Sequence, residues 1–172
     1  MKRKLQIAGI ALLLIVSAFL WKNHQNGSEE RIFKRVLTKM CMYPSKEAKE
    51  LLEVVETEDR LKVMKKMYTA DFSDEGFEDF CKNRYPLSII SAAEEAHCKI
   101  KVNKIELLKE ASDTDNAYYY KASFLLDEKM PVSQNVIVCY ENKKITKFQL
   151  VNSDLMDKIR EIHCLGGYLE RN

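Results

Sequence analysis

Glycine is scarce in this sequence, with only five residues in a chain of 172. No phosphate-cradling G-x-x-x-x-G-K loop, dinucleotide-binding G-x-G-x-x-G turn or nucleophile-bearing G-x-S-x-G motif occurs. Each of these motifs depends on glycine at positions where the backbone must turn sharply or approach a ligand closely. The sequence therefore offers no signal for nucleotide-binding enzymes or serine hydrolases.

Metal-binding and catalytic thiol motifs are also missing, because the five cysteines form no C-x-x-C pair. Two neighbours, His97-Cys98 and His163-Cys164, raise the possibility of a zinc site. Zinc needs about four converging ligands, and adjacent residues on a strand point to opposite faces. We interpret both pairs as coincidence and predict no metal, no cofactor and no catalytic residue.

An excess of charge of either sign is absent. The chain has 28 basic and 26 acidic side chains, and three of the basic ones are Lys2, Arg3 and Lys4. The part that follows Trp21 therefore carries 28 − 3 = 25 basic against 26 acidic groups. A near-neutral domain gives no reason to propose nucleic acid as a partner.

The most informative stretch is apolar and lies near the N-terminus. Leu5–Trp21 holds 17 residues without a charge. At ~1.5 Å per helical residue it spans about 25 Å, slightly short of a hydrocarbon core of roughly 30 Å. The basic cluster that precedes it favours the cytoplasmic side, and Trp21 suits the far interface. We predict a transmembrane helix in contact with the lipid bilayer, with anchor residues Leu5, Leu12, Leu13, Leu14, Ile15 and Trp21.

This segment has two alternative interpretations, a cleaved signal peptide and a buried helix of a cytosolic protein. Signal peptidase needs small residues near the cleavage site, and only Ser17 and Ala18 are small before Phe19. An uncleaved single-pass anchor in the cell membrane, with the C-terminal domain extracytoplasmic, is therefore favoured. The expected organisation is a cytoplasmic tip 1–4, the span 5–21, a linker 22–28, one domain 29–165 and a tail 166–172.

Within the domain, helical spacing of apolar residues comes first and strand alternation follows. Five helices are expected to start at Ser28, Ser45, Thr57, Ser73 and Pro86. The apolar stripe of the second helix is expected to include Val55, and Gly76 in the first turn of the fourth is unfavourable for a helix. Alternation then predicts about four strands, with a slip of register near Asn103, turns at residues 112–116 and 141–144, and a return strand 145–151. A last helix should begin after Ser153 and stop at Gly166-Gly167.

Helices followed by antiparallel strands predict an α+β fold in which helices pack on one face of a curved sheet of about four strands. This order, over Ile32–Val151, resembles the NTF2-like (cystatin-like) group. The resemblance implies a membrane-anchored ectodomain of a bacterial envelope, as in conjugative-transfer machinery. We therefore expect a non-enzymatic domain that contacts envelope proteins or itself. The alternative is a pocket protein of the same fold that binds or transforms a small apolar ligand.

Three groups of side chains have two possible interpretations each. We interpret the five cysteines as buried thiols, and strand cysteines Cys98 and Cys139 are one candidate pair for the alternative, a disulfide. Tyr118, Tyr119 and Tyr120 form either an aromatic interaction patch or ordinary strand filling. An acidic cluster could bind a cation, but we interpret it as the solvated start of a helix; its members are Asp71, Asp74, Glu75, Glu78 and Asp79.

Overall fold

The computed structural model of the protein describes residues 27–110 and 116–169. The predicted span 5–21 and most of the expected turn 112–116 lie outside these residues. Within the described ranges, no helix is both long enough and apolar enough to cross a membrane.

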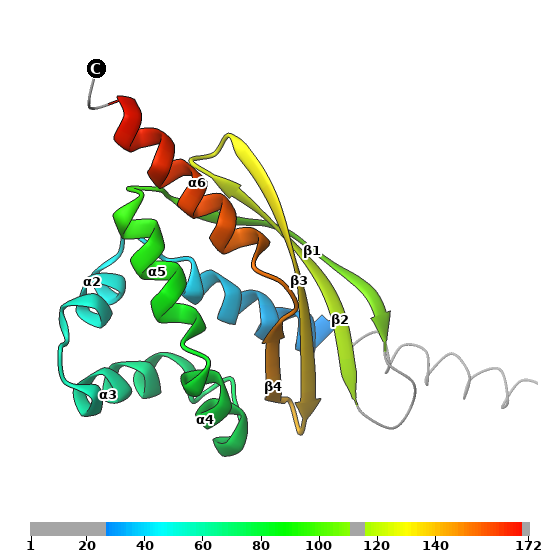
Figure 1. The fold of residues 1–172 in the computed structure, drawn as a ribbon. Helices are drawn as coiled ribbons and strands as arrows, with labels where there is room; N and C mark the ends of the chain where they lie inside the picture. Colours follow the sequence, from blue (N-terminus) through cyan, green and yellow to red (C-terminus); the bar gives the residue numbers. More distant parts are fainter. Residues whose placement is uncertain (1–26, 111–115, 170–172) are drawn as a thin grey trace, which may run out of the picture.

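The chain has the predicted α+β class, with helices first, a four-stranded antiparallel sheet next and a C-terminal helix last (Figure 1). The first described helix, called the first helix below, covers residues 27–40. Four more helices precede the sheet: α2 (Lys46–Glu53), α3 (Thr57–Tyr68), α4 (Asp74–Lys82) and α5 (Tyr85–Glu95). The strands are β1 (Ile100–Glu110), β2 (Ala117–Leu126), β3 (Met130–Glu141) and β4 (Lys144–Leu150), and α6 (Asp154–Leu169) follows them.

Local sequence signals explain where several helices begin. The Ser45 hydroxyl accepts a hydrogen bond from the Ala48 amide at 3.0 Å, which caps α2 as predicted. The Ser73 hydroxyl does the same for α4, where the Gly76 amide donates at 3.1 Å. Thr57 is not a cap, because α3 already includes it and Glu56 takes the cap position without a side-chain hydrogen bond.

The sheet is a meander of order β1-β2-β3-β4. The expected slip of register is confirmed, because the pairing of β1 with β2 shifts between Val102 and Lys104. Asn142 and Lys143 form the tight turn between β3 and β4, and both have the positive φ angles that such a two-residue hairpin requires.

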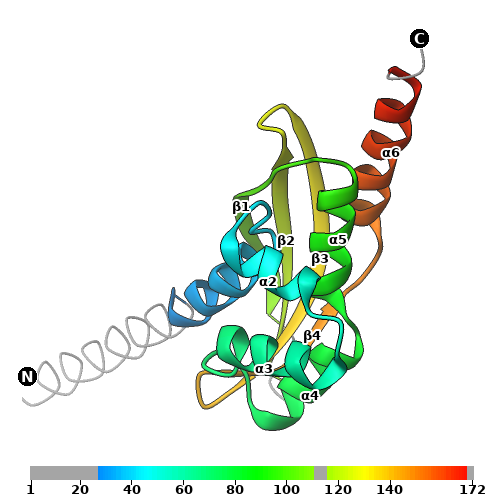
Figure 2. The same cartoon turned by 90° about the vertical axis from the view of Figure 1, so that its left-hand side faces the viewer.

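The helices lie on one face of the sheet, and the first helix crosses that face (Figures 1 and 2). Its Phe33 ring is fully buried and stacks on Tyr120 of β2, with ring centroids 4.5 Å apart. Phe148 of β4 lies 6.2 Å from Phe33 and 5.3 Å from Phe80 of α4. A continuous aromatic core therefore connects the first helix, the sheet and α4.

Gly76 weakened the sequence-based prediction of α4, because glycine is a poor helix former. The structure gives the reason for it. A Cβ atom at this position would lie 2.3 Å from the backbone oxygen of Ile145 and 2.9 Å from the Cα atom of Thr146. Only glycine lets α4 approach β4 this closely.

Two expectations about helix extent are wrong. Val55, predicted on the apolar stripe of the second helix, lies beyond its end and is 87% exposed. The last helix does not stop at Gly166-Gly167, because its backbone stays helical to Leu169. Glycine costs only about 1 kcal/mol in a helix, so it can end a helix but need not.

Candidate functional site

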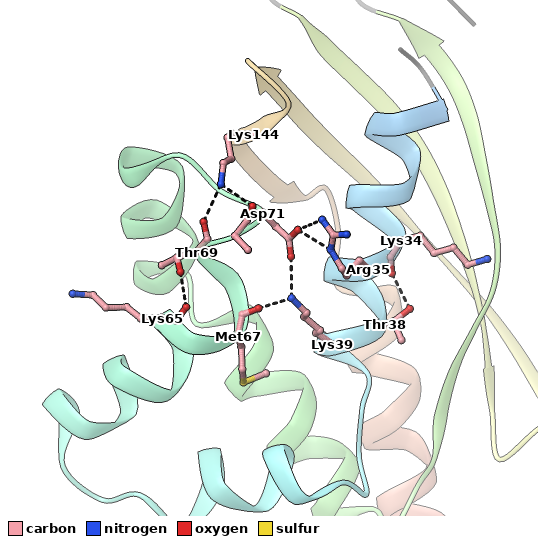
Figure 3. A network of polar contacts seen from close by, with 10 residues as sticks. Lys34, Arg35, Thr38, Lys39, Lys65, Met67, Thr69, Asp71 and Lys144 are labelled. Carbon is pink, nitrogen blue, oxygen red and sulfur yellow. Dashed lines mark hydrogen bonds and ion pairs between the residues drawn. The ribbon is translucent and has the colours of Figure 1, made fainter. Parts of the chain in front are cut away.

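The most deeply buried charge among the described residues is the carboxylate of Asp71, which is 0% exposed. Arg35 of the first helix donates to Asp71 Oδ1 from Nε at 2.8 Å and also from Nη2. Lys39, one turn further along the same helix, donates from Nζ to Asp71 Oδ2 at 2.9 Å. Both carboxylate oxygens therefore accept from cations on one helix, as Figure 3 shows. We call Asp71, Arg35 and Lys39 the Asp71 clasp.

Backbone hydrogen bonds connect the segment around Asp71 to strand β4 of the sheet. The Ile145 amide donates to the Asp71 backbone oxygen at 2.9 Å, and the Ser73 amide donates to the Ile145 oxygen at 3.0 Å. Lys144 donates from Nζ to the backbone oxygen of Ala70 at 2.7 Å (Figure 3). The first helix, the loop between α3 and α4, and β4 thus meet at one residue.

The protonation of Asp71 follows from two opposing effects. Burial alone would raise the pKa of its carboxyl group, but the hydrogen bonds and charges of Arg35 and Lys39 outweigh burial and hold the pKa below its usual range. Asp71 is therefore ionised at neutral pH. A carboxylate whose two oxygens are already engaged is poorly suited to accept a substrate proton, so the arrangement indicates a structural role.

The acidic cluster therefore divides into two environments, and its interpretation as a solvated helix start is wrong for Asp71. The other four members are exposed in or beside the first turns of α4, as expected. Sequence reasoning missed Asp71 because its cationic partners precede it by 36 and 32 residues. No local spacing rule could have connected them.

A first hollow lies among α2, α3, α4 and α5. Its volume is about 140 Å³, and it is lined by Leu51, Thr57, Arg60, Leu61, Met64, Cys81, Arg84 and Leu87. A second hollow of about 590 Å³ lies beside it, and its lining residues are Leu61, Lys65, Thr69, Asp74, Phe77, Glu78, Cys81 and Lys82. Leu61 and Cys81 line both hollows, and we call the surface along α3 and α4 that holds the two hollows the α3–α4 groove.

A third hollow, of about 390 Å³, lies where the start of the first helix meets the sheet. Buried Glu29 lines it together with Tyr118 and Tyr140, and the Tyr140 hydroxyl donates to the Glu29 backbone oxygen at 3.0 Å. Burial raises the pKa of Tyr140 far above its usual value, and the nearby Tyr120 and Glu29 add to the shift. Tyr140 therefore stays protonated and cannot act as a base at neutral pH.

The three consecutive tyrosines do not form one patch. Tyr120 is buried and Tyr118 packs partly against the core, so both face the helices. Tyr119 points to the opposite side and is 39% exposed, beside Lys109 and Ile137 in the strand register. Only Tyr119 is left as a candidate contact residue of this group.

The structure contradicts the candidate disulfide between Cys98 and Cys139, because both cysteines are free. Cys98 precedes β1 at the end of the sheet where Ile100 pairs with Leu126, whereas Cys139 pairs with Ala117 at the other end of β2. Nine residues of strand correspond to roughly 30 Å, and a disulfide needs Cα atoms about 4.4–6.8 Å apart. Periodicity indicated two strand cysteines but could not give their positions along the sheet.

The His97-Cys98 pair follows the end of α5, and the His163-Cys164 pair lies on α6, which contacts that end of α5. His97 is exposed in the loop before β1 while Cys98 is buried, and burial raises the pKa of the Cys98 thiol to about 11. His163 of α6 lies 2.9 Å, through Nδ1, from the backbone oxygen of Glu95 in α5. Within residues 27–110 and 116–164, no three metal-ligating side chains come together.

Comparisons with known proteins return nothing: no family model, no curated protein and no solved structure matches this chain. The resemblance to the NTF2-like group therefore stays a prediction, and function has to be argued from this chain's own residues.

Proposed function

We propose that the protein is a non-enzymatic, membrane-anchored extracytoplasmic domain that acts through protein contacts in a cell-envelope assembly, such as a transfer or secretion machine. One observation carries the proposal. The apolar run ends at Trp21, and residue 27 already belongs to a helix whose apolar side is buried in the domain core. The six residue steps from 21 to 27 reach at most about 22 Å, so an anchored domain would be held close to the bilayer.

The Asp71 clasp supports this interpretation. A domain that hangs on a flexible tether would need no firm attachment of its first helix. Here Arg35 and Lys39 tie that helix to Asp71, and Phe33 packs it against the sheet. The first helix is thereby fixed to the rest of the domain, so the short linker limits how far the domain lies from an N-terminal anchor, which is useful in an assembly of fixed geometry.

Side chains fill the inner face of the sheet, which supports a role in protein contacts rather than in catalysis. In an NTF2-like enzyme this face forms a ligand pocket with an internal acid or histidine. Here its centre is occupied by Phe33, Tyr120 and Phe148, all of them at most 2% exposed. The carboxylate of the buried acid Asp71 is already engaged in ion pairs with Arg35 and Lys39.

Crosslinking of the full chain in intact host cells, followed by purification from membranes, tests the proposal. We expect a reproducible set of envelope proteins, or a second copy of the chain, to be captured. A matched variant with residues 5–21 replaced by a cleavable signal sequence should lose most of that set, because the domain then diffuses away. Recovery of the monomer alone across several crosslinker lengths would contradict the proposal.

A second candidate, a pocket protein for a small ligand, is favoured by the hollow beside Glu29, Tyr118 and Tyr140. A thermal-shift screen of the full chain against small molecules would test it, with Glu29→Gln as the matched variant. This candidate requires a compound that stabilises the natural chain but not the variant. If no compound raises the melting temperature, it is abandoned.

A further inference from the structure

The groove along α3 and α4 has an apolar end and a polar end. At the apolar end, Leu51 and Met64 are buried, and Leu61 on the wall is 39% exposed. Val55, 87% exposed, follows α2 by two residues. Single exposed apolar residues are ordinary on a protein surface, but apolar side chains gathered at a hollow are typical of contact sites.

The size of the apolar end limits what it can accept. A cavity of about 150 Å³ is large enough for a benzene molecule. The hollow at this end measures about 140 Å³. It therefore suits one aromatic ring or one branched aliphatic side chain, and it is too small for a folded element or a long acyl chain.

The charged side chains that line the groove are mostly basic. Arg60 and Arg84 line the apolar end, and Lys65 and Lys82 line the polar end. Two acidic side chains line the polar end, and one of them, Glu78, lies 4.0 Å from Lys82.

The positive charge of Lys65 acts on the thiol of Cys81 inside the groove. Burial raises the pKa of the Cys81 thiol to about 11, and the positive charge of Lys65 opposes that rise. Four basic against two acidic side chains in the lining give the groove a net positive charge, which favours an anionic occupant.

The groove lies on the side of the molecule away from the start of the first helix. In Figure 1, α2 and α3 are at the left, whereas the dark-blue start of the first helix is at the right. If the domain is anchored through its N-terminus, the groove faces away from the bilayer. That placement rests on the proposed function and favours a protein over a lipid as the occupant.

We propose that the α3–α4 groove docks a segment of a partner protein in which an apolar side chain is flanked by carboxylates. The apolar side chain enters the hollow lined by Leu51, Leu61 and Met64. The carboxylates lie beside Arg84 and Lys65, where charge complementarity steers and orients the segment.

Site-specific photocrosslinking in intact host cells tests this docking site. The full chain carries a benzophenone amino acid at position 61 in one variant and at position 119, on the outer face of the sheet, in another. We expect position 61 to capture a protein, and mass spectrometry of the crosslinked peptide should show an apolar residue with Asp or Glu within a few positions. Lys65→Glu combined with Arg84→Glu should reduce that capture roughly tenfold.

The matched control is Lys62→Glu combined with Lys66→Glu, which makes the same change of charge on exposed residues of α3 outside the groove. It should leave capture at position 61 unchanged. Capture at position 119 without capture at position 61, a basic crosslinked segment, or equal loss in both double variants would overturn the docking site but leave the proposed function standing. Absence of capture at both positions would overturn the docking site, and the proposed function falls with it if crosslinking of the full chain also recovers the monomer alone.

Discussion

The half of the domain built on the sheet differs sharply from the half built on α2, α3 and α4. In the first, Phe33, Tyr120 and Phe148 fill the space between the first helix and the strands. In the second, neighbouring helices leave the two hollows that share Leu61 and Cys81. Apolar side chains thus fill the centre of the sheet half, whereas the surface of the helical half is hollowed along α3 and α4.

The difference indicates a division of labour between stability and recognition. Close packing stabilises a domain through many van der Waals contacts. Side chains that line a hollow lack part of those contacts. The Asp71 clasp connects the first helix to the loop that leads into α4 through ion pairs. We therefore expect substitutions to lower stability strongly in the sheet half and weakly along the groove.

The largest effect is expected for Phe33→Ala. This side chain is fully buried against Tyr120, and removal of a buried phenylalanine typically costs about 3–5 kcal/mol of unfolding free energy. Urea unfolding of the detergent-solubilised full chain, followed by circular dichroism, measures the change. A loss below about 1 kcal/mol would show that the sheet half is not the stable part of the domain.

Gly76→Ala should have the next largest effect. The added Cβ would lie 2.3 Å from the Ile145 oxygen, so α4 and β4 must separate, and overpacking of this kind costs about 1–3 kcal/mol. Gly27→Ala is the matched control, because nothing lies within 4 Å of its Cβ position. The same unfolding measurement should show no loss for Gly27→Ala, and equal losses in both variants would refute the close approach of α4 to β4.

Asp71→Asn should cost about 2 kcal/mol, in line with hydrogen bonds that involve charged groups. The partial exposure of Arg35 and Lys39 moderates the loss, because both can return to water. Asp59→Asn, which removes an exposed partner of Lys62, is the control and should change stability by less than about 0.5 kcal/mol. Similar effects from the two variants would contradict a structural role for the clasp.

The clasp also predicts a dependence of stability on pH. The pKa of Asp71 is lower in the folded chain than in the unfolded chain, so its contribution is fully present above the unfolded value of about 4. That contribution is lost as the pH falls below about 4 and through the lower folded pKa. Unfolding curves between pH 2 and 7 should show a smaller acid-induced loss for Asp71→Asn than for the natural chain. Parallel curves would show that Asp71 is not held ionised by the clasp.

The smallest effect is expected for Leu61→Ala in the groove. Because Leu61 is 39% exposed beside an open hollow, its removal should cost less than about 1 kcal/mol. The same unfolding measurement, with Phe33→Ala as the reference, sharpens the contrast between the two halves. A loss as large as that of Phe33→Ala would mean that the groove is part of the core.

Much of the fold could be predicted from local patterns. The Ser45 and Ser73 caps and the turn after Glu141 each depend on residues within a few positions of one another. The helical spacing of apolar residues also predicted the first helix correctly, and their alternation predicted strand β2 correctly. Short-range physics is sufficient for these features because their hydrogen bonds close locally.

The parts that failed depend on contacts distant in the sequence. The burial of Asp71 is made possible by Arg35 and Lys39, and the need for Gly76 arises from Ile145. The Cys98–Cys139 hypothesis failed because strand order and length decide which residues meet. The groove was not predicted at all, since a hollow depends on how helices pack and has no signature in spacing.

The central claim, an anchored domain outside the cytoplasm, is tested most directly through Cys164, an exposed cysteine of α6. Intact host cells would be treated with a membrane-impermeant maleimide, with Cys164→Ser as the control for the labelled thiol. The account predicts labelling of Cys164 in intact cells, on a chain of full length that sediments with membranes. Labelling that occurs only after the cells are broken open would place the domain in the cytoplasm and contradict the account.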